Sequence, residues 1–274
     1  MKLSVSCRIA EGFLSKEEAL MTLPELCDLA VEAGYQAICM RASQVGVHSS
    51  PEEIRAAAGT IQDRGLSVGM VTGDFNIVYN NDRGPDCLQQ ITSYLDLAEQ
   101  LSSTLVRVCI RTESDIAAAA RAADEAAERG ITLVHQCHVQ SLFETVDDIE
   151  RRLKQIGRDN FGLIFEAANL EECRQDYGIQ TIRRLAPWIR NVYLQNQKLK
   201  DDGAVTLDTW THGPVSLDLL SIPEPGGIDF PQIFEGLKQI GYDGLVTVHQ
   251  SAPEDGSSPV VSAAETARYL KTLI

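Results

Sequence analysis

One pattern repeats along the chain and restricts its fold more than any other feature. A charged stretch with helical periodicity ends at a Gly or Asn, and a short apolar run follows at once, as seen at 30–41, 61–72, 126–137, 156–167 and 238–250. Glycine suits the left-handed position that ends a helix. Runs that are apolar on both faces are typical of strands in a buried parallel sheet. The repeat therefore predicts βα units of about 30 residues each.

Eight such units fit into the 274 residues. The strands are predicted at 3–9, 36–41, 66–72, 104–110, 131–137, 161–166, 190–195 and 244–249. The helices are predicted at 23–33, 51–64, 84–101, 113–129, 143–157, 171–186, 229–240 and 259–273. Eight units predict an α/β fold, a (β/α)8 TIM barrel, as a single domain over 1–274. The competing open, doubly wound sheet usually has fewer strands.

Three helix starts carry capping signals. Thr22 and Ser50 each precede a Glu by three residues, with a Pro in the first turn, which is typical of a capping box. Thr145 is a further candidate N-cap, because acidic residues follow it in the first turn. By contrast, no Gly-x-Gly-x-x-Gly follows the first strand, so we expect no nucleotide cofactor.

The long irregular stretch 196–228 follows strand seven. A loop of this length in a compact domain is usually functional, and barrel enzymes hold their chemistry at the C-terminal face, where this loop begins. Trp210 and His212 favour a substrate cover over a solvated surface insertion.

Composition excludes several classes of partner. Lys plus Arg number 24 against 39 Asp plus Glu, giving a net charge of −15, which argues against binding nucleic acid or an anionic membrane. No apolar run reaches the roughly 20 residues that span a bilayer, and no secretory signal is visible. The seven cysteines are odd in number and scattered, as expected in a reducing compartment. We therefore expect a cytoplasmic protein.

Polar residues stand at the predicted strand ends, where a barrel directs side chains into a common pocket. They are Arg41, Arg107, Arg111, Gln136, His138, Glu166, Asn169, Tyr193, Gln195 and His249. These residue types suit a metal, a sugar or an anion. Glu166 ends an apolar run, and a carboxylate there is rarely unpaired. We expect its partner to be a metal, a ligand or an arginine such as Arg107.

The order of motifs resembles the xylose isomerase-like TIM-barrel superfamily, of the sugar phosphate isomerase/epimerase type. The clearest match is the segment PGGIDFPQIFEGLKQIGYDGLVTVH near the C-terminus. The segments ITLVHQCH, NFGLIFEAANL and PWIRNVYLQN follow the order and spacing of the superfamily. The resemblance covers essentially the whole chain but does not select one reaction, because the superfamily includes isomerases, epimerases, dehydratases and an endonuclease. The net charge disfavours the endonuclease branch.

The resemblance implies one divalent metal held by Glu, Asp, His and Glu at the ends of strands five to eight. The matching positions here are Gln136, Glu166, Tyr193 and His249, so all four differ from the usual types. Asn169 stands where the family has a second His, and Gln195-Asn196 replaces its Lys-Asp. The negative charge around the ion falls from about three to one, which weakens binding of Mg²⁺ or Mn²⁺. Zn²⁺ remains chemically feasible with Gln136, Glu166 and His249 as ligands.

The resemblance also implies chemistry next to a sugar carbonyl. With a metal, the dication polarises the substrate while Glu166 or His249 removes a proton and His138 donates or accepts one. Without a metal, Glu166 and His249 form an acid/base pair, or the site only binds.

Three functions stay open: a carbohydrate isomerase, epimerase or lyase; a non-catalytic sugar-binding or regulatory barrel; and an enzyme for phosphorylated substrates with Arg41, Arg107 and Arg111 as anion clamps. Salt bridges are an equally good expectation for these arginines. The expected partner is a small carbohydrate-like ligand, and a homodimer is an expectation by analogy. The candidate substrate-binding residues are Arg41, His48, Arg107, Arg111, Asn169, Tyr193, Gln195 and His212.

Overall fold

A closed ring of eight parallel strands forms the centre of the computed structural model, which describes residues 1–12, 16–252 and 258–274. The strands are β1 (Lys2–Ser6), β2 (Ala37–Arg41), β3 (Ser67–Thr72), β4 (Leu105–Arg107), β5 (Thr132–Gln136), β6 (Phe161–Glu166), β7 (Ile189–Leu194) and β11 (Leu245–Val248). Their order around the ring is β1-β11-β7-β6-β5-β4-β3-β2. The predicted (β/α)8 barrel is confirmed.

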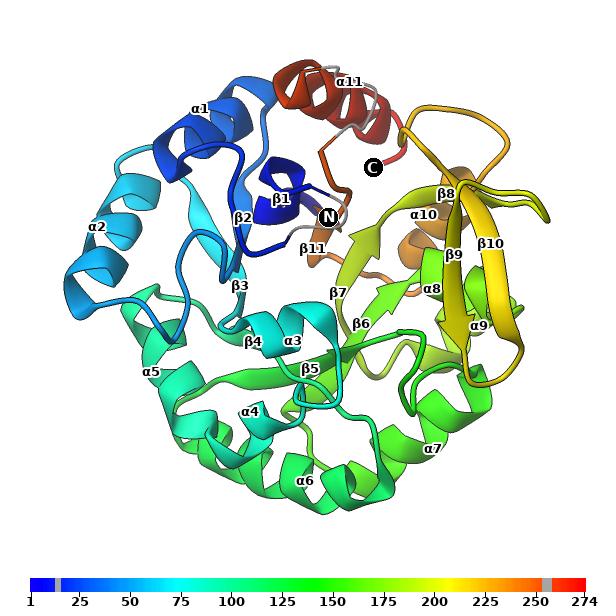
Figure 1. Cartoon of the computed structure of the whole chain (residues 1–274), viewed down its shortest axis with the longest axis horizontal. Coiled ribbons are helices and arrows are strands. Elements are labelled where there is room, and N and C mark those ends of the chain that lie inside the picture. The colour runs from blue at the N-terminus through cyan, green and yellow to red at the C-terminus, as the bar shows by residue number, and fades with distance from the viewer. Residues whose placement is uncertain (13–15, 253–257) are drawn as a thin grey trace.

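An outer ring of helices surrounds the strands (Figure 1). Its members are α1 (Leu23–Ala33), α2 (Pro51–Gln62), α4 (Asp86–Gln89), α5 (Ile91–Gln100), α6 (Glu113–Glu128), α7 (Val146–Ile156), α8 (Ala167–Glu172), α9 (Ile179–Leu185), α10 (Phe230–Gln239) and α11 (Pro259–Lys271). No helix in the described ranges combines the length and the apolar character that a membrane span requires.

The predicted helix caps are present. Thr22 and Ser50 each accept a hydrogen bond from the backbone N–H of the Glu three residues later, and each Glu reaches back to the cap. Thr145 accepts from the N–H of Asp148. Side-chain oxygens thus satisfy N–H groups that have no partner within the helix.

Two predicted helices are broken in the structure. The stretch 84–101 forms α4 and α5, which meet at Gln90, and 171–186 contains only the end of α8 before α9 begins. Arg174 lies between α8 and α9 and has a left-handed φ of 52°. A right-handed helix cannot continue through such a residue. The sequence also did not predict α3 (Phe75–Tyr79), which lies inside the helix ring in Figure 1.

The stretch 196–228 was predicted as an irregular loop, and this prediction is wrong. It contains a three-stranded antiparallel sheet of β8 (Asn196–Leu199), β9 (Val205–Thr209) and β10 (Gly213–Leu220), with β10 in the middle. Val215 and Leu217 are buried and alternate with less buried neighbours on β10, as expected for a sheet with one covered face. In Figure 1 this sheet lies beside the barrel over α8 and α9.

The inside of the barrel is apolar at one level and polar at the next. Six buried side chains from β2 to β7 form an inner cluster: Cys39, Met70, Leu105, Val134, Ile164 and Tyr193. Side chains two residues apart on a strand share a face. The positions that follow the first five of these on the same face are Arg41, Thr72, Arg107, Gln136 and Glu166. The barrel thus brings polar residues of five adjacent strands into one space.

All seven cysteines are buried as free thiols, which matches the absence of a predicted disulfide framework. Cys39 belongs to the inner cluster of the barrel, Cys7 follows β1 directly, and burial raises the pKa of both thiols.

Two glycines give a matched test of the packing. A Cβ on Gly162 in β6 would lie 2.6 Å from the backbone oxygen of Trp188, whereas a Cβ on Gly59 in α2 meets nothing within 4 Å. Gly162→Ala should lower the free energy of unfolding by about 1–3 kcal/mol. Gly59→Ala should raise it by about 0.5–1 kcal/mol through its helix propensity. Urea unfolding of the two variants measures both values, and equal effects would contradict the tight contact at Gly162.

Candidate functional site

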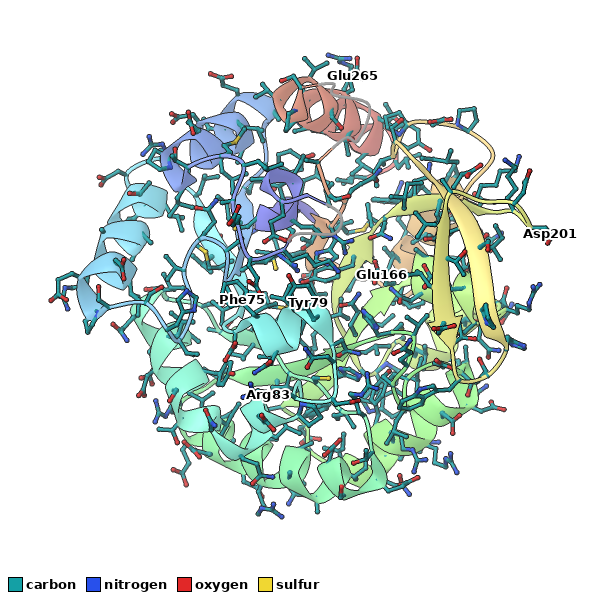
Figure 2. All side chains as sticks on the ribbon, in the orientation of Figure 1. Phe75, Tyr79, Arg83, Glu166, Asp201 and Glu265 are labelled. Carbon is teal, nitrogen blue, oxygen red and sulfur yellow. The ribbon has the colours of Figure 1, made fainter. Side chains whose placement is uncertain are left out.

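A layer of buried polar side chains closes the C-terminal end of the barrel. The most buried members are Ser6, Arg41, Thr72, Arg107, Gln136, Glu166 and His249, each at most 2% exposed. Figure 2 shows Glu166 inside the helix ring, whereas Asp201 and Glu265 lie at the periphery. The predicted meeting of strand ends is therefore present.

Two amides hold Glu166 in place. Its Oε2 accepts hydrogen bonds from Nε2 of Gln136 on β5 and from Nδ2 of Asn169 on α8. Its Oε1 is buried and has no hydrogen-bond partner among the described residues. Burial raises the pKa of Glu166, while the bond from Gln136 and the charges of Arg8 and Arg107 act in the opposite direction. The carboxyl group is oriented through one oxygen and leaves the other available.

Arg107 does not form the salt bridge with Glu166 that the sequence left open, since no ion pair within 4 Å joins these two described residues.

A second carboxyl group, that of Glu172, lies nearby on α8. Burial and the charge of Glu166 raise the pKa of Glu172 to about 8, so Glu172 is mostly neutral at pH 7. Glu172 was not a candidate from the sequence, because it lies in a stretch with the pattern of an ordinary charged helix.

His249 and Tyr193 lie face to face on neighbouring strands. Their rings stack with centroids 3.9 Å apart at an interplanar angle of 10°, and His249 Nδ1 is 3.2 Å from Ser6 Oγ. The hydroxyl of Tyr193 is 3.2 Å from the Cys39 thiol. Burial, followed by the charges of Arg8 and Arg41, holds the pKa of His249 well below its usual range. His249 is therefore a neutral imidazole at pH 7.

His138 lies half-buried just beyond the end of β5. Its Nδ1 donates to the backbone oxygen of Val139 at 2.8 Å, since a carbonyl only accepts. This bond fixes the neutral tautomer and leaves Nε2 without a proton. Burial and the charge of Arg107 lower the pKa of His138 well below its usual range.

Arg41 forms a buried ion pair that the sequence did not reveal. Its Nε lies 3.0 Å from both carboxylate oxygens of Glu11, and both side chains are fully buried. Ser43 Oγ also donates to Glu11. Nη1 and Nη2 of Arg41 have no hydrogen-bond partner among the described residues. Nothing in the local sequence identified Glu11. It lies several residues after the end of the first strand, and only the folded loop brings its side chain to Arg41.

Two further cations, Arg8 and Lys16, were also missed. Arg8 lies in the short 3-10 helix η1 (Cys7–Ala10), directly after β1. Its charge interacts with those of Arg41, Glu166, Glu11 and Arg107. Burial, together with the charges of the three arginines, lowers the pKa of Lys16 to about 7. Arg8 could have been found by treating the end of strand one like the other strand ends.

The remaining candidates lie at the rim. Arg111 is 3.0 Å from Asp82 and stacks on the Trp210 ring at 5.2 Å. His212 Nε2 donates to the backbone oxygen of Cys173. His48 is exposed and stacks on Phe75 of α3, while Gln195 is half-buried just after β7.

The tip of the β9–β10 hairpin is tied to the rim by one carboxylate. Glu144 is buried after β5 and accepts from the backbone N–H groups of Gln140, Trp210 and Thr211 at 2.6–2.8 Å. The hairpin, and with it the predicted cover residues Trp210 and His212, is thus fixed at the edge of the polar centre.

The chemistry of the four predicted metal-ligand positions does not fit a divalent metal. Gln136 and Asn169 donate to Glu166, so their N–H groups and not their oxygens face it. Tyr193 stacks on His249, and the cations Arg8, Arg41 and Arg107 interact with His249. No group of three or more His, Cys, Asp or Glu in the described part of the chain is arranged to hold a metal. A dication here would meet repulsion with one carboxylate to offset it.

Comparisons with known proteins extend this description. A family model described as "Xylose isomerase-like TIM barrel" matches residues 27–273. An inosose dehydratase of Geobacillus thermodenitrificans is 23% identical over 152 residues, which are 55% of this chain and 51% of that protein. The chain thus spans about half the length of the curated relatives it matches.

Solved structures match over almost the whole chain. A D-psicose 3-epimerase of Clostridium cellulolyticum H10, solved with D-tagatose, superposes with a TM-score of 0.76 at 12% identity, covering 100% of this chain and 99% of the other. A xylose isomerase-like TIM-barrel protein of Mycobacterium smegmatis, solved with magnesium, gives a TM-score of 0.68 at 18% identity, covering 92% and 87%. At these identities the likeness concerns the fold.

The buried ion pair predicts a large stability effect. Glu11→Ala should destabilise the protein by about 3–5 kcal/mol, because it leaves the buried Arg41 without its partner. Asp202→Ala removes the exposed partner of Lys200 and should change stability little. Urea unfolding compares the two variants. A small effect of Glu11→Ala would show that Arg41 is not paired as described.

Proposed function

The chain belongs to the xylose isomerase-like TIM-barrel family, and from that premise we propose that it is an enzyme acting on a carbohydrate or a related polyhydroxy ketone. The proposed reaction class is isomerisation, epimerisation or elimination, begun by removal of a proton next to a carbonyl group. The names of the relatives, an inosose dehydratase and a D-psicose 3-epimerase, support this class of substrate and reaction.

The observation that carries the proposal is the arrangement of Glu166. A buried carboxylate with one oxygen fixed by two amide donors and the other without a partner is suited to accept a proton at a defined point. Burial raises the pKa of Glu166 above that of an ordinary carboxyl group, which makes its ionised form a stronger base.

In the proposed mechanism Oε1 of Glu166 accepts the proton from the carbon next to the carbonyl. Electron density then moves onto the carbonyl oxygen, and the positive charges of Arg8 and Arg107, which act on Glu166 through space, stabilise this developing charge. The protonated carboxyl group of Glu166 then returns this proton to carbon or to a leaving hydroxyl group. His138 is neutral and its Nε2 carries no proton, so this atom can accept a hydrogen bond from a substrate hydroxyl group. Because the residues do not fit a divalent metal, no step of this mechanism uses one.

A non-catalytic sugar-binding barrel is the second candidate. Its support is the loss of the carboxylates that the family uses as ligands, since Gln136 and His249 stand at two of their positions. Both candidates place the ligand at Glu166, and they differ in whether hydrogen exchange accompanies binding.

Glu166→Gln tests the choice between them. The enzyme should catalyse exchange of the hydrogen next to the carbonyl with solvent deuterium on at least one member of a panel of inososes, ketohexoses and their phosphorylated or carboxylated counterparts, and NMR measures this exchange. Glu166→Gln should lower the rate roughly 10²–10⁴-fold, because the amide cannot accept the proton. Glu128→Gln, on the outer end of α6, is the matched control. Binding without exchange in the unmodified protein would favour the non-catalytic barrel.

The pH profile should also report Glu166. Its ionised form is the base, so the rate should fall as the pH drops through a pKa above the ordinary value of 4.5. Asn169→Ala removes a donor that lowers this pKa and should move the acid limb to higher pH. Gln100→Ala, an exposed helix amide, should leave it unmoved. An acid limb that stays in place in Asn169→Ala would assign the titration to another group.

A further inference from the structure

Two buried arginines face one another across β3 at the C-terminal end of the barrel. Arg41 on β2 pairs in register with Thr72 on β3, and Val71 of β3 pairs with Val106 of β4. Thr72 is therefore level with Arg107. Adjacent strands lie about 4.8 Å apart, so the two arginine backbones are roughly 10 Å apart and their side chains enter the same space.

Each arginine keeps one complete edge of its guanidinium free of protein partners. Arg41 uses Nε on Glu11, and its two terminal nitrogens Nη1 and Nη2 have no partner among the described residues. On Arg107 the free pair is Nε and Nη2, which form the side edge of the group. Two parallel N–H donors on one edge match the two oxygens of a carboxylate or phosphate.

Both side chains are almost completely closed to solvent, at 0% and 1% exposure. Unpaired buried charge and unsatisfied donors are costly, and structures retain them mainly where a ligand completes the site. Glu11 is already bound through Nε of Arg41, and Glu166 is bound by its two amides. The protein itself therefore supplies no acceptor for these two edges within the described residues.

We propose that Arg41 and Arg107 bind an oxyanion group of the substrate, a carboxylate or a phosphate, and that their positive charge stands in for the family's dication. The substrate is thus an anionic polyhydroxy compound, and its binding needs no metal. This inference rests on the proposed function in placing the substrate beside Glu166. Since the edges are buried, ligand entry requires a local opening of the residues above them.

Three polyols that differ only in charged group provide the test: D-sorbitol, D-gluconate and D-sorbitol 6-phosphate. Isothermal titration calorimetry on the full chain, in buffer containing EDTA, should give binding of D-gluconate or D-sorbitol 6-phosphate and none of neutral D-sorbitol. The anion that binds assigns the carboxylate or the phosphate. Equal binding of all three, no binding of either anion, or binding that appears only when Mg²⁺ replaces EDTA would each overturn the proposal.

Arg107→Met removes one edge and keeps much of the side-chain volume. It should weaken binding of the anion roughly 10²–10⁴-fold, as expected for two lost charge-assisted hydrogen bonds. Arg107→Lys keeps the positive charge but loses the pair of parallel N–H donors, so it should weaken binding to a smaller extent. This variant also tests the proposal if the Met variant does not fold. Arg55→Met, on the exposed face of α2, is the matched control, and an affinity unchanged in both Arg107 variants would overturn the proposal.

Glu166→Gln separates this proposal from the proposed function. The variant should bind the anion with nearly the affinity of the unmodified protein, because Arg41 and Arg107 are intact. Anion binding by the unmodified protein without any deuterium exchange would support the anion site and contradict the proposed enzyme activity. Exchange on neutral ketohexoses without anion binding would do the reverse.

Discussion

Closure of the parallel sheet brings the polar side chains of the candidate site together. Because alternate residues of every strand face the barrel axis, one polar residue at a strand end brings its charge into a space shared with seven other strands. Arg41, Arg107 and Glu166 lie one step above an apolar layer that contains Cys39, Leu105 and Ile164. The apolar layer excludes water from below, so the polar groups above it must satisfy one another or a ligand. The Glu11–Arg41 ion pair and the amide hydrogen bonds to Glu166 satisfy some of these polar groups within the protein.

The sequence predicted the barrel because its evidence is local and repeated. All eight barrel strands lie within a few residues of their predicted positions, and the capping residues Thr22 and Ser50 mark real helix starts. The sheet of β8, β9 and β10 was missed because its antiparallel strands mix polar and apolar residues, unlike the apolar runs that identified the barrel strands. The breaks after Gln90 and at Arg174 depend on backbone conformations that periodicity does not report.

The site was predictable only in part. Glu166, Gln136 and His249 were recognised because polar residues interrupt apolar strands at positions with a family counterpart. Glu11 and Lys16 lie in the segment after β1 that has no such pattern, and only the folded path of this segment brings them to Arg41. The loss of the family's carboxylates and the presence of Arg41 and Arg107 could therefore be read from the chain, whereas Glu11 and Lys16 required the fold.

The seven buried thiols have a practical consequence. Burial raises the pKa of every one of them, and the thiolate is the form that reacts. In the folded protein they are thus shielded twice, by lack of access and by protonation. They are spread from η1 to the end of α8, so the order in which they become alkylated would map how the barrel unfolds, with Cys39 reporting on its centre and Cys27 on its outer helices.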